Sequence, residues 1–184
     1  MKKYYEALSF AAQLHDGQFR KGSKVPYLTH LMTVSSYVFE FGGSEDQAIA
    51  GLLHDAIEDQ GNKTYLKELE KLFGSEVSRI VAACTDTEVE PKPPWEERKK
   101  AYLEKLGEKD SSIKLVVACD KFHNAQCIVR DVKLYGPDVW KRFNAEPARI
   151  LWYYETLVVN LTDLNSVLIK LLDMEVKEIK KLIS

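Results

Sequence analysis

The stretch Gly51-Leu-Leu-His-Asp-Ala-Ile-Glu-Asp59 contains the most informative pattern of this sequence. It holds a His-Asp pair, His54-Asp55, and one helical turn later a Glu-Asp pair, Glu58-Asp59. At about 100° per residue, these four side chains fall within one arc of a helix, and the apolar residues fall mostly on the other side. The pattern predicts a helix with one face in the core and an imidazole and three carboxylates on the other.

The acidic face of this helix is costly to bury, because packed carboxylates repel one another and lose their hydration. A divalent metal ion removes that cost, since neutral imidazole and carboxylate are good ligands for it. For a bare His-Asp dipeptide, a solvated helix face with a hydrogen-bonded histidine is the better interpretation. The full His-Asp-x-x-Glu-Asp pattern favours a metal site, provided that further ligands lie elsewhere in the chain.

The composition indicates one globular domain. Its 184 residues can bury a sizeable core, and 45% hydrophobic and 29% charged residues are ordinary values. The net charge of -2 argues against general nucleic-acid binding, which normally needs an excess of basic residues. We expect neither a membrane span nor a signal peptide. Cys84, Cys119 and Cys127 lie among apolar residues without paired spacing, so we expect reduced thiols in a cytoplasmic protein.

A basic loop precedes a second candidate ligand, His30. Two glycines and a proline in residues 16–26 interrupt the helical pattern, and the loop carries Arg20, Lys21 and Lys24. A solvated loop is the plain interpretation of such a cluster. A phosphate-binding loop is the alternative, because arginine makes bidentate contacts with phosphate and lysine acts as a point charge. His30 follows in the first turn of the next predicted helix.

A third candidate segment ends in Asp120. The nearly continuous apolar run of residues 113–119 precedes it, and we interpret this run as a buried helix. An aspartate at the end of so apolar a run needs a partner. A salt bridge with Lys121 or Arg130 would supply one, and a metal ion is the other solution.

Helical periodicity recurs along the whole chain, without a convincing strand, internal repeat or low-complexity tract. Glycine, proline and N-cap residues such as Ser44 separate the helical segments. We therefore predict an all-α protein, a single helical bundle of about eight to ten helices. Residues 1–184 would form one domain, with a core of about residues 5–160 and a C-terminal packing helix of about residues 162–182.

Together these residues resemble the HD-domain metal-dependent phosphohydrolases, in which His30, His54-Asp55 and Asp120 have counterparts in the same order and approximate spacing. Four stretches are more specific and resemble the hydrolase domain of the RelA/SpoT family: His15-Asp-Gly-Gln-Phe-Arg-Lys21, Pro26-Tyr-Leu-Thr-His30, Leu53-His-Asp-Ala-Ile-Glu-Asp59 and Asp120-Lys-Phe-His-Asn124. The resemblance spans about residues 5–160, and we expect no synthetase domain. The sequence therefore resembles a stand-alone small alarmone hydrolase, similar in plan to the metazoan SpoT homologue.

The resemblance implies roles for particular residues. Four would hold one divalent ion, usually Mn²⁺ in this family: His30, His54, Asp55 and Asp120. Glu58 and Asp59 would be the catalytic acidic pair. Four would bind the substrate: Arg20, Lys21, Asn124 and Arg98.

The implied activity is hydrolysis of the 3′-pyrophosphate of the guanosine alarmones (p)ppGpp to GDP or GTP plus pyrophosphate. A metal-activated water would attack, with Glu58 placed to orient or deprotonate it. One alternative is an HD phosphohydrolase that acts on (p)ppApp or another nucleotide. The other is a non-catalytic module that binds an alarmone or a protein partner.

For an enzyme of either kind, the expected partner is a small-molecule nucleotide, and we expect no nucleic-acid or membrane partner. Three tyrosines are candidates for stacking on the base: Tyr27, Tyr153 and Tyr154. A binding module would not need an intact set of ligands and acidic residues, and this sequence keeps all of them.

Overall fold

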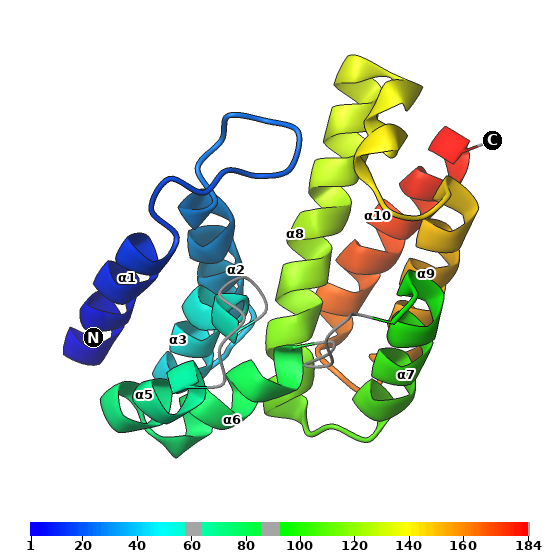
Figure 1. Ribbon diagram of the computed structural model, residues 1–184. Coiled ribbons are helices and arrows are strands. Elements are labelled where there is room, and N and C mark those ends of the chain that lie inside the picture. The colour runs from blue at the N-terminus through cyan, green and yellow to red at the C-terminus, as the bar shows by residue number, and fades with distance from the viewer. Residues whose placement is uncertain (58–63, 86–92, 184) are drawn as a thin grey trace.

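The computed structural model of the protein describes residues 1–57, 64–85 and 93–183 (Figure 1). Among these residues it has nine α-helices, one 3-10 helix and no strand, which confirms the all-α prediction. The helices are α1 (Lys2–Leu14), α2 (Leu28–Glu40), α3 (Glu45–Leu53), α5 (Thr64–Phe73), α6 (Ser75–Cys84), α7 (Trp95–Gly107), α8 (Ser111–Tyr135), η1 (Pro137–Arg142), α9 (Pro147–Asn160) and α10 (Ser166–Ile183).

The long helix α8 runs through the centre of the molecule, with α2, α3, α6, η1 and α10 packed around it (Figure 1). All residues from Ile113 to Asp120 are buried, and all of these except Lys114 and Asp120 are apolar. Such a segment must be surrounded by other helices. Asp110 caps its N-terminus, and Gly136, with φ of 77°, follows its last turn. This confirms the prediction that residues 113–119 form a buried helix.

Helices α2 and α3 pack so closely that glycine is required at the contact. A Cβ atom at Gly51 would lie 3.1 Å from the Cα of Ser35. The Ser35 hydroxyl donates to the Ala48 carbonyl oxygen at 2.8 Å, which satisfies a polar side chain with no exposed surface. The chain reverses between the two helices, so the beginning of α2 lies beside the end of α3. That pairing brings the His30 and His54 segments together.

The N-terminus of α3 is as predicted, but its C-terminus is not. Ser44 and Gln47 form a reciprocal capping box, which confirms the predicted cap. The sequence predicts a continuous helix through Asp59, which lies outside the described residues. In the structure α3 ends at Leu53, a turn holds His54 and Asp55, and the backbone is helical again at Ala56 and Ile57. In this turn the His54 imidazole donates from Nδ1 to the Gly51 carbonyl oxygen at 2.8 Å. The last carbonyls of a helix lack backbone partners, and His54 thereby satisfies one of them.

The C-terminal helices close the other side of α8. Helix α10 packs against both α8 and α9, and Leu168, Leu172 and Ile179 are fully buried there. Burial of each such side chain stabilises the fold by about 1.5–3 kcal/mol. Helix α7 packs on α9. Within the described ranges, no helix is both long enough and apolar enough to cross a membrane.

Candidate metal centre and the adjoining cavity

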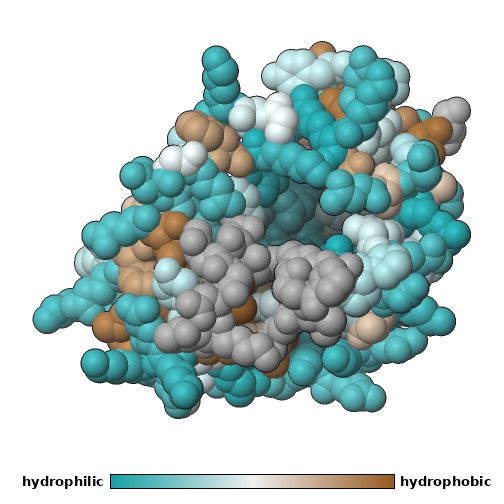
Figure 2. Space-filling view, in the orientation of Figure 1, coloured by the Kyte–Doolittle hydropathy of each residue, from teal (hydrophilic) through white to brown (hydrophobic). Residues whose placement is uncertain are grey.

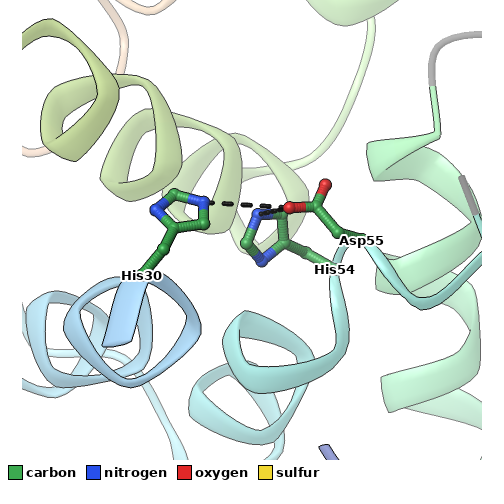
Figure 3. A group of neighbouring side chains, drawn as sticks. All are labelled: His30, His54 and Asp55. Atoms are coloured by element: carbon green, nitrogen blue, oxygen red, sulfur yellow. Dashed lines mark ion pairs between the residues drawn. The ribbon is translucent and has the colours of Figure 1, made fainter. Parts of the chain in front are cut away.

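Two helix ends bring three of the predicted ligands together (Figure 3). His30 lies in the first turn of α2, and His54 and Asp55 lie directly after α3. One ligand atom from each of these residues lies within 4.8 Å of the other two. His30 and His54 are only 1% and 3% exposed, and the Asp55 side chain is 20% exposed. The two imidazoles are therefore shielded from solvent, and the Asp55 carboxylate is the most accessible of the three ligands.

Asp120 reaches the same point from α8. Its Oδ1 atom lies 3.2 Å from Nε2 of His30 and 3.6 Å from Nε2 of His54. On the other side, Oδ2 of Asp55 lies 3.0 Å from Nε2 of His54 and 3.8 Å from Nε2 of His30. Two imidazole nitrogens thus face two carboxylate oxygens, and all four predicted ligands meet in one place.

The two imidazole nitrogens that face the carboxylates support the binding of a metal ion at this centre. Nε2 of His30 and Nε2 of His54 are buried, and neither has a hydrogen-bond partner among the described residues. Each nitrogen lies within ion-pair distance of a carboxylate oxygen. An unsatisfied buried polar atom costs about 1–3 kcal/mol. Two imidazoles and two carboxylates form a donor set that suits a divalent ion.

The charges of the centre also favour a bound cation. Burial lowers the pKa of His54, but the Asp55 and Asp120 carboxylates outweigh this effect and hold that pKa well above its usual value. Burial alone would raise the pKa of Asp120, yet the charges of Lys121 and His54 keep it well below its usual range. Both carboxylates are therefore ionised, and a positive charge between them is strongly favoured.

Asp120 uses its two oxygens for two purposes. Oδ2 pairs with Lys121 Nζ at 2.6 Å, while Oδ1 faces the histidines. The predicted salt bridge with Lys121 is therefore present, and the second carboxylate oxygen of Asp120 remains directed at the candidate metal centre. Arg130, the other predicted ion-pair partner, pairs with Asp131 instead.

A cavity of about 860 Å³ adjoins the centre. Residues 20–25 form one wall, the segment of α8 from His123 to Tyr135 forms another, and η1 and the following Phe143 close the end. In the space-filling view the molecule is hollowed near its middle, and hydrophilic side chains form much of the visible rim (Figure 2). None of the four predicted ligands lines this space, but residues that contact three of them do: Tyr27 beside Asp55, His123 beside His30 and Asn124 beside Asp120. A polar space large enough for a small-molecule ligand therefore lies next to the centre.

Three of the four predicted substrate-binding residues line this cavity: Arg20, Lys21 and Asn124. Arg20 donates from Nη2 to Oδ1 of Asn124 at 2.7 Å, and Asn124 donates from Nδ2 to Oδ1 of Asp120 at 2.5 Å. This chain of hydrogen bonds links a cation of the basic loop to a predicted metal ligand. The loop itself is closed by a bond from the Arg20 N–H to the Val25 carbonyl oxygen at 2.8 Å.

The other predicted site residues lie elsewhere. Arg98 is in α7, where its Nε donates to the Pro93 carbonyl oxygen at 3.1 Å, and it is not among the described residues that line the cavity. Glu58 and Asp59 lie outside the described residues.

The tyrosines predicted as base-stacking candidates have different surroundings. Tyr27 stacks on His15, and its hydroxyl donates to Oδ2 of Asp55 at 2.5 Å. Tyr153 and Tyr154 are each 5% exposed, and of these two only Tyr154 lines the cavity. The Tyr27 hydroxyl therefore supports a predicted ligand while Tyr27 also lines the cavity, and the two buried tyrosines present little surface to a base.

Several residues that line the cavity were not identified from the sequence as site residues, among them His123, Tyr135 and Arg142. Tyr135 is 65% exposed. Asn124, Cys127, Asp131 and Tyr135 are three or four residues apart, so they lie on one face of α8. This spacing is visible in the sequence and could have identified Tyr135. Arg142 belongs to the separate element η1, and helical spacing could not have found it.

Comparison with known proteins agrees with this geometry. A family model described as HD domain matches residues 7–150. The human guanosine-3′,5′-bis(diphosphate) 3′-pyrophosphohydrolase MESH1 is 34% identical over 144 residues, which cover 77% of this chain and 75% of that protein. The enzyme of the same name from Drosophila melanogaster is 32% identical over 141 residues, which cover 75% of this chain and 74% of that one.

Two solved structures share the fold. One is of a metazoan ortholog of SpoT that hydrolyses ppGpp, with a TM-score of 0.81, 27% identity and coverage of 100% of this chain and 98% of that one. The other is of a protein from Listeria monocytogenes, with a TM-score of 0.71, 27% identity and coverage of 84% and 98%. With the family model spanning most of its length, the chain belongs to the HD-domain family.

Proposed function

We propose that this protein is a metal-dependent phosphohydrolase that removes the 3′-pyrophosphate of (p)ppGpp, releasing pyrophosphate and GDP or GTP. The observation that carries the proposal is the hydrogen-bonded chain from Arg20 through Asn124 to Asp120, which joins a basic loop to a dry His-Asp centre. Relatives named for this reaction match about three quarters of the chain, which supports the same substrate class. A cytoplasmic location is part of the proposal.

Four residues would hold the ion, which we propose to be Mn²⁺: His30, His54, Asp55 and Asp120. A divalent ion bound there supplies Lewis acidity toward a phosphoryl oxygen and lowers the pKa of a water molecule. The overall reaction breaks the bond between O3′ and its phosphorus. The oxygen of water joins that phosphorus, and O3′ leaves with a proton.

The side chains of the protein would orient the substrate and balance its charge. Arg20 has donors left beyond its bond to Asn124, and Lys21 is exposed at the same wall. These cations would bind the pyrophosphate and offset the charge that develops on it. Because Asn124 holds the Arg20 guanidinium, this cation is in position before the substrate arrives. Glu58 would orient or deprotonate the attacking water, a role that rests on the sequence alone.

The test is an assay of purified, Mn²⁺-loaded protein with ppGpp and ppApp side by side, resolving pyrophosphate and nucleoside diphosphate. We expect pyrophosphate release from ppGpp that EDTA and Asp55→Ala abolish. The control is Asp173→Ala, which removes an exposed aspartate of α10 that pairs with Lys177. Faster turnover of ppApp would assign the enzyme to adenine alarmones. No release from either substrate by folded, metal-loaded protein would refute the proposal.

A further inference from the structure

The cavity continues well beyond the metal centre along one face of α8. Asn124, Cys127, Asp131 and Tyr135 line it at intervals of three or four residues. At about 1.5 Å per residue, Asp131 lies roughly 16 Å along the helix axis from Asp120. That length suits a nucleotide that carries phosphate groups on both its 3′ and its 5′ oxygens. Groups at the far end can therefore contact a part of the ligand that does not react.

The cavity as a whole is strongly cationic. Five cationic side chains and a single carboxylate are found among the described residues that line the cavity: Arg20, Lys21, Lys24, Arg130, Arg142 and Asp131. The whole chain has a net charge of -2, so this excess is local and not a reflection of composition. A cavity with this charge attracts a polyanion.

Arg142 lies at the end of the cavity away from the metal centre, and contacts on two sides hold its side chain. Its Nη1 donates to Oδ2 of Asp131 at 3.1 Å, and its guanidinium lies 5.9 Å from the centroid of the Tyr135 ring. A Cβ atom at Gly22, whose φ is 73°, would come within 2.5 Å of the Arg142 side chain. Contacts with α8 and with the basic loop thus hold a side chain that is only 26% exposed. Glycine suits this left-handed backbone conformation, and its lack of a side chain leaves room for Arg142 beside the loop.

Asp131 orients two arginines without neutralising both. Its Oδ1 accepts from Nε and Nη2 of Arg130, and its Oδ2 accepts from Nη1 of Arg142. One negative charge is shared by two guanidinium groups, so a positive charge is left over. The bond to Asp131 occupies one of the five N–H donors of Arg142. Oriented guanidinium groups with open donors are suited to bidentate contacts with phosphate.

We propose that the far end of the cavity is a second phosphate subsite, built around Arg142 and Arg130, which binds the 5′-diphosphate or 5′-triphosphate of the substrate. This proposal rests on the proposed function, in which the 3′-pyrophosphate lies at the metal centre. The subsite selects nucleotides that are phosphorylated on both sides of the ribose over those phosphorylated only on the 3′ side. Its contribution is to binding, because its cations lie far from the bond that breaks.

The test compares two substrates of the Mn²⁺-loaded protein: guanosine 3′,5′-bis(diphosphate) and guanosine 3′-diphosphate, which lacks 5′ phosphates. We expect Arg142→Gln to raise KM for the first on the order of tenfold, the usual scale for a lost charge-assisted hydrogen bond, with kcat within about twofold. KM for the second substrate should not change. The control is Arg149→Gln, which removes an arginine of α9 that pairs with Glu96 and lies outside the cavity lining. Equal effects of Arg142→Gln on both substrates, or no effect on either, would overturn the subsite.

A binding measurement separates this inference from the proposed function. If neither substrate is hydrolysed, calorimetric titration with GDP and with guanosine 5′-monophosphate still reports on the subsite. Wild-type protein should bind GDP more tightly, and Arg142→Gln should remove most of that difference. The same affinity for both nucleotides in the wild type would refute the subsite, whatever the catalytic activity.

Discussion

The Nδ1 atoms of His30 and His123 lie 2.6 Å apart, so one imidazole donates a hydrogen bond to the other. Nε2 of His30 faces the carboxylates of the centre, and a metal ligand must present a lone pair there. The proton of a neutral His30 then sits on Nδ1, and His123 is the acceptor. Burial lowers the pKa of His123 to about 4, which keeps this ring neutral and able to accept near neutral pH.

His123→Phe should weaken metal binding, because it removes the acceptor that holds His30 in the ligating tautomer. Loss of such a supporting bond typically costs about 10–100-fold in metal affinity. His123→Gln, whose amide oxygen can accept the same bond, should recover part of the loss. Competition between the protein and a chelating dye for Mn²⁺ measures the affinity. Nitrogen-15 shifts of His30 should show the Nδ1-protonated ring in the wild type, and full affinity in His123→Phe would rule the role out.

Tyr27→Phe should also weaken metal binding, through Asp55. The Tyr27 hydroxyl donates to Oδ2 of Asp55, the oxygen that faces both histidines. Hydrogen bonds to charged groups contribute about 1.5–3 kcal/mol, so we expect roughly a tenfold loss of Mn²⁺ affinity or more. Phenylalanine keeps the ring that stacks on His15. In the control Tyr37→Phe, a hydroxyl bonded to Gln126 is lost, and the affinity should stay at the wild-type value. If Tyr27→Phe matches this control, Tyr27 only fills space.

Removal of the metal should lower the thermal stability of the protein. The ion offsets repulsion between two ionised carboxylates, and binding to the folded state alone stabilises it by about 2.7 kcal/mol at 100 times the dissociation constant. Scanning calorimetry of EDTA-treated protein, with and without added Mn²⁺, should therefore show a rise in Tm with the ion. Asp55→Ala should abolish that rise. An equal rise in the wild type and Asp55→Ala would place the stabilising ion elsewhere.

Asp110→Ala should destabilise the central helix. Oδ1 of Asp110 accepts the backbone N–H groups of Ser112 and Ile113 at 2.9 and 3.2 Å, and loss of such a cap costs about 1 kcal/mol. The hydrogen bond from Arg79 holds the pKa of Asp110 below its usual value. Urea unfolding at pH 7 measures the loss, and an unchanged midpoint would show that the cap contributes nothing.

The same pKa shift predicts how the stability difference between the wild type and Asp110→Asn depends on pH. Because the folded pKa lies below the unfolded one, the charge of Asp110 stabilises the protein at pH values above about 4. This contribution is lost as the pH falls from there through the folded pKa. Asparagine keeps the cap but has no charge to titrate. The stability difference between the wild type and Asp110→Asn should therefore shrink between pH 5 and pH 2, and a constant difference would contradict the shift.

The sequence alone was sufficient to predict features that depend on residues close together along the chain. The capping box of Ser44 and Gln47, the buried helix before Asp120 and the all-α class follow from periodicity and caps, which act over a few residues. The end of α3 did not follow. A continuous helical pattern crosses His54, whereas the structure has a turn there, in which the His54 side chain bonds to the Gly51 carbonyl oxygen.

The tertiary structure decided which distant side chains meet. No local rule pairs His30 with His123, Tyr27 with Asp55, or Gly22 with Arg142. These contacts arise because α2, α3 and the basic loop all pack on α8, so residues far apart in the chain share one dry centre and one cavity. The sequence by itself determined which ligand types and helices are present. Only the packing of those helices determined the site, because contacts across the core depend on the whole set of buried faces at once.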